Sequence, residues 1–336
     1  SASLVGSEMC IRDSVYRVFL IMNNKTAEIL GGNMKRAIID IGTNSVRLLE
    51  AEKNDSGDWS VKRKEVKTTR LGEGMTDQAM ISAASKERTI KAVCDFSKTA
   101  RQDGYDDIRG YGTSIMRDAS NGIEFAGEIT AQSGIPIRIL SGREEAFYSY
   151  LGAAGKTAVI TSVVDIGGGS TEICIGFGHD IGMRYSFRLG AVRCSHAFDS
   201  SSPRGLGELR KHCFEVFRCT ELINEAQAVK NWVIVGGTAT SMAAILQELE
   251  VYDSSKVQGY TMNQDTVTKL LERLFNMTYD ERCHLPGMQP ERADIIVAGV
   301  VILDALMEYF AIPEVHVSDR DLSEGLLDAD VIMPQN

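Results

Sequence analysis

Two aspartates that share the same surrounding sequence are the first candidates for chemistry in this chain. The string DIGTNS at residues 40–45 returns as DIGGGS at residues 165–170, and each copy joins a short apolar run to another strand-like run. A carboxylate at the end of a buried strand, next to a turn of small residues with exposed N–H groups, can hold phosphate and a hydrated divalent metal ion. Two such strand–turn–strand units that face each other would form a cleft for phosphoryl chemistry.

A simpler interpretation is that each aspartate caps its own turn, as aspartates often do. The repetition favours the functional interpretation, and so do the differences between the copies. When the two copies are aligned on their aspartates, Arg47 of the first matches Glu172 of the second. One side of the cleft would therefore offer a cation and the other a carboxylate. The triple glycine Gly167–Gly169 would also let a phosphate approach the backbone closely.

A third pair of small residues, Gly236 and Gly237, ends an apolar strand and opens a predicted helix. The N-terminus of a helix binds anions because its free N–H groups and its dipole point the same way. A tight strand-to-helix turn without any ligand fits the sequence equally well.

Strand-like and helix-like patterns alternate from Met34 onward, which predicts an α/β fold with two domains. In the first half the pattern predicts strands at 36–40, 45–52, 59–67, 108–111 and 136–140, and helices at 82–102 and 121–132. In the second half it predicts strands at 159–165, 170–177, 181–188, 232–237 and 314–318, and helices at 206–228, 240–249, 264–275 and 291–310. We expect domains at 34–155 and 156–336, with a hinge near Gly152–Gly155. Residues 1–33 are expected to be an upstream extension outside both domains.

The predicted helix that begins after Ser141 places two neighbouring glutamates at its start. Ser141 as N-cap and Glu144 as third helical residue match a capping box. This assigns Glu144 to the helix end and leaves Glu145 free to face the cleft.

Composition and charge exclude several classes of function. The 336 residues are 43% hydrophobic and 24% charged, and no apolar run approaches the roughly 20 residues of a membrane helix. A net charge of −10 argues against broad nucleic-acid binding. The seven cysteines are scattered, without a CxxC pair, which is typical of reduced thiols in a cytoplasmic protein.

Eight motifs in fixed order show a resemblance to a known family. They are DIGTNSVRLL, GTSIMRDASN, ILSGREEAFY, VVDIGGGSTE, LGAVR, VGGTATSM, QPERADIIVAG and VSDRDLSEG. From Met34 to about Leu327 the chain resembles the exopolyphosphatase and guanosine pentaphosphate phosphatase family. The resemblance implies two ribonuclease H-like (actin-like ATPase) domains with the active site in the cleft between them. It also implies inorganic polyphosphate or guanosine pentaphosphate as substrate, Mg²⁺ or Mn²⁺ as cofactor, and a possible homodimer.

The resemblance assigns the central catalytic role to Glu145. In the family, the glutamate before the alanine of the SGxxEA motif activates water, and Glu144 is the competing neighbour here. Glu145 would deprotonate a water molecule for in-line attack on the terminal phosphorus. Most of the remaining catalysis should come from positioning and charge neutralisation.

The remaining site residues are assigned to phosphate or to metal. Phosphate-binding roles fall to Asn44, Ser45, Thr113, Arg117, Gly167, Gly168, Ser170, Arg193 and Gly237. Metal-binding roles fall to Asp40, Asp165 and Glu172. Thr113 and Arg117 are expected in a loop, where a guanidinium can grip phosphate oxygens bidentately.

Some features leave alternatives open. The basic stretch Val61–Arg70 could bind a polyanionic chain, although such strands are usually solvated faces. Ser323 stands where the family commonly has arginine, which could alter long-chain affinity. A kinase or ATPase of the same superfamily, or a silent sensor of polyphosphate or an alarmone, would use a similar cleft.

Overall fold

The computed structural model describes residues 34–74, 80–218, 220 and 222–329. The predicted extension at 1–33 lies outside the described residues, as do Cys10 and Cys219. The other five cysteines, Cys94, Cys174, Cys194, Cys213 and Cys283, are free thiols. None of the helices within the described ranges is both long and apolar enough to cross a membrane.

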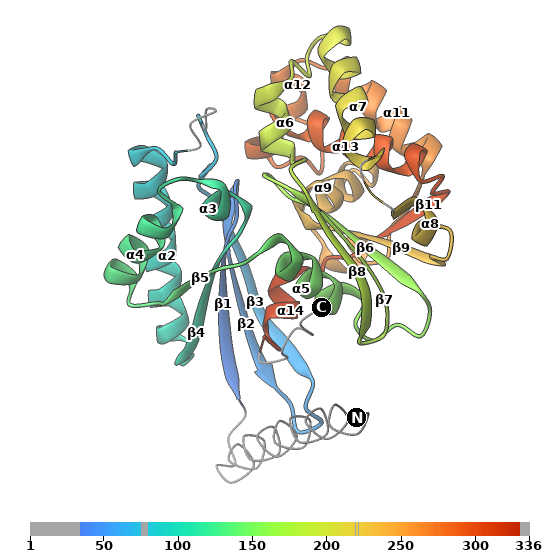
Figure 1. Cartoon of the computed structure of the whole chain (residues 1–336). Coiled ribbons are helices and arrows are strands. Elements are labelled where there is room, and N and C mark those ends of the chain that lie inside the picture. The colour runs from blue at the N-terminus through green and yellow to red at the C-terminus, as the bar shows by residue number, and fades with distance from the viewer. Residues whose placement is uncertain (1–33, 75–79, 219, 221, 330–336) are drawn as a thin grey trace, which may run out of the picture.

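The chain forms two sheets with helices packed on their faces, as the alternating pattern predicts (Figure 1). The first sheet has the order β3 (Trp59–Thr68), β2 (Ser45–Lys53), β1 (Lys35–Ile41), β4 (Asp107–Gly112) and β5 (Ile137–Ile139). Strands β1, β2 and β3 form an antiparallel meander, and β4 and β5 run parallel to β1.

The second sheet repeats this topology with one added strand. Its order is β10 (Thr261–Asn263), β11 (Glu314–Val317), β9 (Asn231–Val235), β6 (Thr161–Ile166), β7 (Thr171–Phe177) and β8 (Asp180–Phe187). Strands β6, β7 and β8 form the antiparallel meander, and β9 and β11 continue in parallel. The two sheets are therefore two versions of one fold, with β10 added at an edge.

The repeated turns have the same backbone geometry. The Gly42 N–H donates to the Ser45 carbonyl at 2.9 Å, and the Gly167 N–H donates to the Ser170 carbonyl at 3.0 Å. In the strand pair that each turn connects, Asp40 lies opposite Arg47, and Asp165 lies opposite Glu172. The alignment made from the sequence is thus the alignment of the two sheets, with a cation and a carboxylate in equivalent places.

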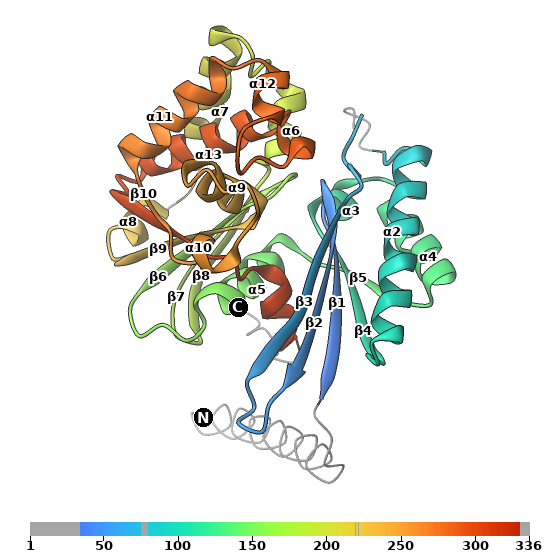
Figure 2. The ribbon, with the colours of Figure 1, turned by 180° about the vertical axis from the view of Figure 1, so that it is seen from behind.

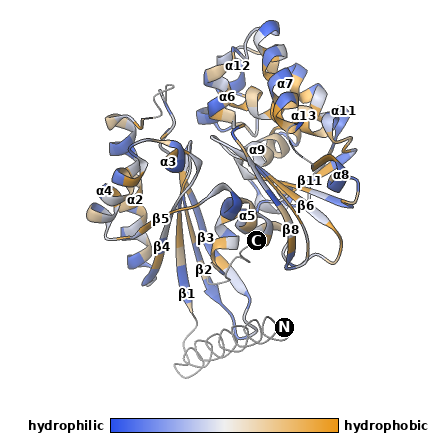
Figure 3. Cartoon of the chain, viewed as in Figure 1, coloured by the Kyte–Doolittle hydropathy of each residue, from blue (hydrophilic) through white to orange (hydrophobic). Residues whose placement is uncertain are grey.

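Each sheet has one face covered by its own helices. On the first sheet these are α2 (Ala83–Gln102) and α4 (Gly122–Ser133). On the second they are α6 (Ala191–Ala197), α7 (Pro203–Arg218), α9 (Gly236–Leu246), α11 (Gln264–Phe275) and α13 (Ile296–Tyr309). Helix α13 is mostly apolar, and twelve of its fourteen residues are buried (Figure 3). A helix of this kind belongs in the centre of a helical layer.

Two helices fill the space between the sheets: α5 (Gly142–Ala154) and α14 (Leu322–Leu326) (Figures 1 and 2). Phe147 and Tyr148 of α5 join the core of the first sheet, whereas Ala146 and Tyr150 pack against the second sheet. Gly152 lies inside this packed helix and Gly155 is its C-cap, so the predicted hinge segment Gly152–Gly155 covers the last turn of α5 and its end. The predicted domain boundary at residue 155 falls between the last strand of the first sheet and the first strand of the second.

Short helices account for the main differences from the predicted elements. The segment predicted as a loop after β4 contains α3 (Ser114–Asp118), so Arg117 is helical. Helix α6 was not predicted, and the helical segments predicted near 206–228 are α7 and α8 (Leu222–Ala226). The last long helix starts at Ile296, after the 3₁₀ turn η1 (Pro290–Arg292). Helices of five to seven residues are too short to show a helical period in the sequence.

A buried carboxylate ties three helices of the second half, α7, α11 and α13, together. Asp304 on α13 is fully buried, pairs with Arg210, and accepts hydrogen bonds from Gln264 Nε2 and Thr268 Oγ1, both at 2.7 Å. We expect Asp304→Ala to lower the free energy of unfolding by about 1–3 kcal/mol for each buried donor left without its acceptor, Gln264 and Thr268, whereas the half-buried Arg210 keeps its second partner, Glu308. Urea unfolding measures this.

The control for that experiment is Asp265→Ala, since Asp265 pairs with Lys269 in solvent at 2.6 Å. An exposed pair of this kind contributes at most about 1 kcal/mol. Equal losses in the two variants would contradict a structural role for the Asp304 cluster.

Candidate active site

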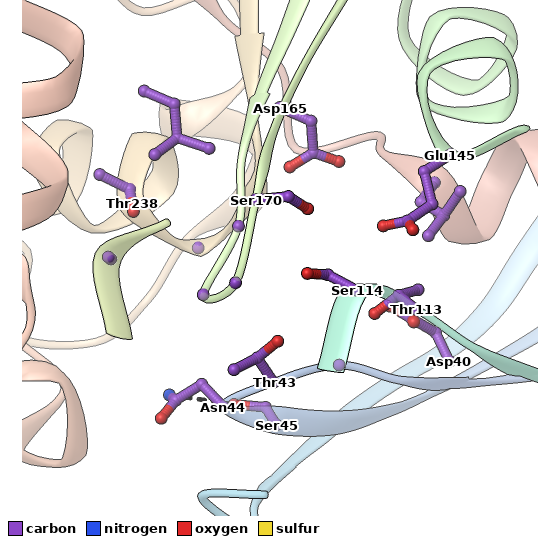
Figure 4. Close-up of a pocket in the computed structure, with 18 of the residues that line it drawn as sticks. Asp40, Thr43, Asn44, Ser45, Thr113, Ser114, Glu145, Asp165, Ser170 and Thr238 are labelled. Carbon is purple, nitrogen blue, oxygen red and sulfur yellow. Dashed lines mark hydrogen bonds between the residues drawn. The ribbon is translucent and has the colours of Figure 1, made fainter. Parts of the chain in front are cut away.

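The two repeated turns face each other across one pocket (Figure 4). Of the predicted site residues, the pocket is lined by Asp40, Asn44, Ser45, Thr113, Glu145, Asp165, Gly167, Gly168, Ser170, Glu172 and Gly237. The structure therefore brings together residues from β1, β2, α5, β6, β7 and α9, from the two repeated turns, and from the end of β4, where Thr113 follows the strand. Arg117 and Arg193 do not line the pocket but lie beside it.

The capping box at the start of α5 is present and places the two glutamates differently. Ser141 Oγ accepts from the Glu144 N–H at 3.3 Å, and Glu144 Oε2 accepts from the Ser141 N–H at 2.8 Å. Glu145 is only 5% exposed, and its side chain turns into the pocket. There Arg117 Nη1 forms an ion pair with Glu145 Oε1 and donates to the Leu140 carbonyl at 3.0 Å.

The surroundings of Glu145 suit a base more than a structural anion. Burial raises the pKa of this carboxyl well above its ordinary value, and the nearby Glu172 charge raises it further against the opposing effect of Arg117. A carboxyl with a raised pKa accepts a proton more readily, which is what general-base catalysis at neutral pH requires.

Two carboxylates on the second sheet lie beyond Glu145. Asp165 Oδ2 accepts from Ser149 Oγ at 2.8 Å, and Glu172 Oε1 accepts from Ser186 Oγ at 2.6 Å. Burial, followed by the Asp321 charge, raises the pKa of Asp165 to about 6. Burial, followed by the Asp165 charge, raises the pKa of Glu172 to about 8. Crowded carboxylates of this kind favour the binding of a cation, which would hold them ionised.

The equivalent aspartate on the first sheet is partly neutralised by the protein. Arg47 Nη1 lies 3.4 Å from Asp40 Oδ2 and 3.1 Å from Asp321 Oδ2. Asp40 Oδ1 is buried without a hydrogen-bond partner. Burial raises the pKa of Asp40 to about 7, although Arg47 opposes the shift. Within the described ranges, His, Cys, Asp and Glu side chains form no group of three placed to hold a metal ion.

The carbonyls of the second turn accept hydrogen bonds from the first N–H groups of α6, and the N–H groups of the turn remain available to the pocket. The N–H groups of Ala191 and Val192 donate to the carbonyls of Gly167 and Gly168, each at 2.9 Å. In the described part of the chain the N–H groups of Gly168 and Gly169 donate to no protein acceptor. Such a turn leaves donors available for phosphate oxygens.

The N-terminus of α9 contributes further donors to the same pocket. Gly236 has φ +87°, and a side chain at this position would lie 2.6 Å from Asp165 Oδ1. Only glycine therefore allows α9 to begin next to this carboxylate. Gly237 and Thr238 follow at the first turn and line the pocket.

A functional candidate that the sequence interpretation missed is Arg292 in η1. Its guanidinium lies directly against Gly237 and lines the pocket, and its Nε donates to Gln289 Oε1 at 2.8 Å. Among the described residues no carboxylate pairs with it. Burial, followed by the Arg47 charge, lowers the pKa of Arg292 to about 10. The motif QPERADIIVAG contained the signal, because it carries this arginine.

The guanidinium of Arg193 already has partners within the protein. Its Nε donates to the Gly169 carbonyl at 2.8 Å, and its Nη2 pairs with Asp118 Oδ2. Its guanidinium thus contacts the backbone of the phosphate turn.

The basic stretch on β3 and after it is also paired with carboxylates. The pairs are Lys62 with Glu52, Arg63 with Glu50 and Asp103, Lys64 with Asp319 and Glu324, Lys67 with Asp95, and Arg70 with Asp294. This stretch is therefore not a strip of unpaired cations.

A larger groove of about 860 Å³ continues from the pocket and shares Arg47, Gly237 and Arg292 with it. Its walls include Val61 and Val66 of β3 on one side and Tyr252 on the other, all three exposed. Ser323, which stands in place of the usual arginine, also lines this groove.

Comparison with known proteins identifies related sequences. Residues 51–332 match the profile of the Ppx/GppA phosphatase family. Exopolyphosphatase 2 of Mycobacterium tuberculosis is 29% identical over 312 residues, which cover 86% of this chain and 96% of the relative.

Solved structures show the same architecture. The Aquifex aeolicus member of the Ppx/GppA family matches with a TM-score of 0.74 and 27% identity, over 89% of this chain and 98% of that one. An exopolyphosphatase from Cytophaga hutchinsonii matches in fold with a TM-score of 0.80 at 23% identity, over 88% and 97% of the two chains. The expected pair of actin-like domains is thereby confirmed.

Proposed function

This chain belongs to the Ppx/GppA phosphatase family and is a phosphatase, and we propose that it releases the terminal phosphate of inorganic polyphosphate. The observation that carries the proposal is Glu145, a buried carboxylate with a raised pKa that faces two opposed phosphate turns. The name of the mycobacterial relative supports polyphosphate as the substrate class. The free thiols support a cytoplasmic location.

In the proposed mechanism Glu145 orients a water molecule and takes its proton as the oxygen attacks the terminal phosphorus. The N–H groups of Gly168 and Gly169 and the N-terminus of α9 hold the phosphate oxygens. Arg292 adds a positive charge that no carboxylate of the described residues pairs with. The shortened polyphosphate is the leaving group. Arg117 keeps the Glu145 carboxylate in place until the water binds.

The site fits a hard divalent cation such as Mg²⁺ or Mn²⁺. Asp165 and Glu172 would hold it from the second sheet, and Asp40, whose Oδ1 has no partner, would assist across the pocket. These oxygen donors are the ligands that Mg²⁺ prefers, usually with several water molecules retained. The bound ion would neutralise charge on the phosphate oxygens.

The free energy of unfolding should depend on pH, because three carboxyls have raised pKa values in the folded protein. These values are about 7 for Asp40, about 6 for Asp165 and about 8 for Glu172. The folded protein binds more protons than the unfolded chain, so its stability should fall as pH rises from 5 to 8. The limit is about 1.4 kcal/mol per pH unit for each titrating group. Thermal unfolding of EDTA-treated protein should show the decrease, and MgCl₂ should reverse it at pH 8.

The control is Glu172→Gln, which should weaken both the pH dependence and the effect of MgCl₂. A melting temperature that is independent of pH and of MgCl₂ in the wild type would contradict the assignment of these carboxylates.

The groove that continues from the pocket suits the remainder of the substrate, because it shares Arg292 and Arg47 with the phosphate site. A second candidate substrate is guanosine pentaphosphate. The exposed side chains of Val61, Val66 and Tyr252 in this groove favour it, since an inorganic chain makes no use of apolar contacts and a nucleoside does.

A substrate panel tests the proposed function directly. Phosphate release with Mg²⁺ is measured on tripolyphosphate, long-chain polyphosphate, guanosine pentaphosphate and ATP. We expect the highest kcat/KM on an inorganic polyphosphate. A preference for guanosine pentaphosphate would support the second candidate. Tight ATP binding without phosphate release from polyphosphate or guanosine pentaphosphate would contradict both and favour a kinase-like or ATPase function.

A further inference from the structure

One carboxylate beside the pocket contacts guanidinium groups from both sides of the cleft. Asp118 is the last residue of α3, which follows the first-sheet strand β4. Its Oδ2 pairs with Arg193 Nη2 and lies 3.5 Å from Arg188 Nε, and its Oδ1 lies 3.9 Å from Arg117 Nε. Arg188 follows the second-sheet strand β8, and Arg193 lies in α6. Asp118 therefore links the first-sheet side of the cleft to the second-sheet side.

Two of the arginines that pair with Asp118 also contact the proposed catalytic groups, which are the base Glu145 and the second phosphate turn. Arg117 pairs with Glu145, the proposed base. Arg193 donates from Nε to the Gly169 carbonyl at 2.8 Å, at the tip of the second phosphate turn. Asp118 itself does not line the pocket, and its side chain is 17% exposed. Its contact with the reaction is thus indirect, through one guanidinium on each side.

We infer that Asp118 is a positioning residue: its carboxylate fixes Arg193, and through Arg193 the turn that holds the phosphate, relative to Glu145. The inference rests on the proposed function. Hydrogen bonds between charged groups are roughly twice as strong as neutral ones and set geometry well. A displacement of about 1 Å between attacking water and phosphorus can lower a rate about 10²-fold.

The local charge balance gives this role a distinct kinetic signature. Three guanidinium groups surround one carboxylate, so Asp118→Asn makes the mouth of the pocket more positive while it releases Arg193. A polyanionic substrate should then bind as well as before or better, whereas alignment of the phosphate turn is lost. We expect kcat to fall at least tenfold with KM for tripolyphosphate unchanged or lowered. A general loss of folded protein would not lower KM.

The experiment compares steady-state phosphate release from tripolyphosphate with Mg²⁺ by wild type, Asp118→Asn, Arg193→Gln and the double variant. If Asp118 acts through Arg193, the double variant has the same kcat as Arg193→Gln alone. Asp107→Asn is the matched control, because Asp107 also bridges two arginines, Arg36 and Arg109, at the opposite end of β4. We expect this control to keep the wild-type kcat.

A second variant, Arg193→Lys, keeps the charge but replaces the two separate donor nitrogens, Nε to Gly169 and Nη2 to Asp118, by one ammonium group, and should lose kcat as Arg193→Gln does. It provides the test if Asp118→Asn does not fold. An unchanged kcat in Asp118→Asn, or losses that multiply in the double variant, would overturn the inference. A wild-type protein without activity on tripolyphosphate contradicts the proposed substrate instead. The same variants are then compared on whichever substrate of the panel is hydrolysed.

Discussion

Glu145→Gln is expected to lower kcat on polyphosphate by about 10² to 10⁴, the usual contribution of a general base. The amide keeps the size of the side chain and can still contact Arg117, but it cannot accept the proton of the attacking water. Because burial and the Glu172 charge disfavour an ionised carboxylate here, the variant should unfold at the same temperature as the wild type or higher. Phosphate release and thermal unfolding measured on the same preparation give both values.

The neighbouring Glu144→Gln is the natural control. Glu144 is held by the capping box and by an ion pair with Arg138, so its loss should affect the start of α5 and leave catalysis in place. The cost in stability should be at most about 1 kcal/mol, from the loss of the exposed ion pair with Arg138, because glutamine at this position can still form the capping box. A Glu145→Gln protein as active as wild type would rule out Glu145 as the base.

Arg292→Met should lower kcat/KM on polyphosphate by about 10²- to 10³-fold, comparable to the loss of one preorganised donor at an anionic transition state. The same change should leave the free energy of unfolding unchanged or raise it. The reason is that Arg292 is desolvated next to Arg47 and, among the described residues, has no carboxylate partner. Activity and stability should therefore change independently.

Arg282→Met is the contrasting variant, since Arg282 also lies before α13 but donates to three backbone carbonyls, those of Leu274, Met277 and Ala293. We expect it to lose stability and to retain kcat/KM per folded molecule. If Arg292→Met proved as destabilising as Arg282→Met and no less active than wild type, a phosphate-binding role for Arg292 would be excluded.

The parts of the site that are local in sequence could be predicted from the sequence. The repeated DIG strings predicted two equivalent strand–turn–strand units, and their alignment gave Arg47 and Glu172 equivalent positions, as the strand register shows. The capping box separated Glu144 from Glu145 because its hydrogen bonds join residues only three positions apart. Such geometry depends on local backbone conformation, which neighbouring residues largely determine.

Contacts between distant segments could not be predicted in this way. Arg193 was expected to bind phosphate, and its partner Asp118 comes from the other side of the cleft. Arg292 was not singled out, because its lack of an anionic partner is a property of the folded chain. The pairing of the basic residues on β3 likewise depends on carboxylates from α2 and from residues 319–324.

The placement of α14 has a consequence for how the protein is made. Leu322, Leu326 and Leu327 cover Ile38 and Leu49, residues that a ribosome produces at the opposite end of the chain. During translation, α14 is made after all five strands of the first sheet, so it cannot yet bury this face of the sheet when the strands have emerged. The first half of the molecule therefore completes its core last, and a nascent chain interrupted before Leu322 would leave an apolar sheet face exposed to chaperones and proteases.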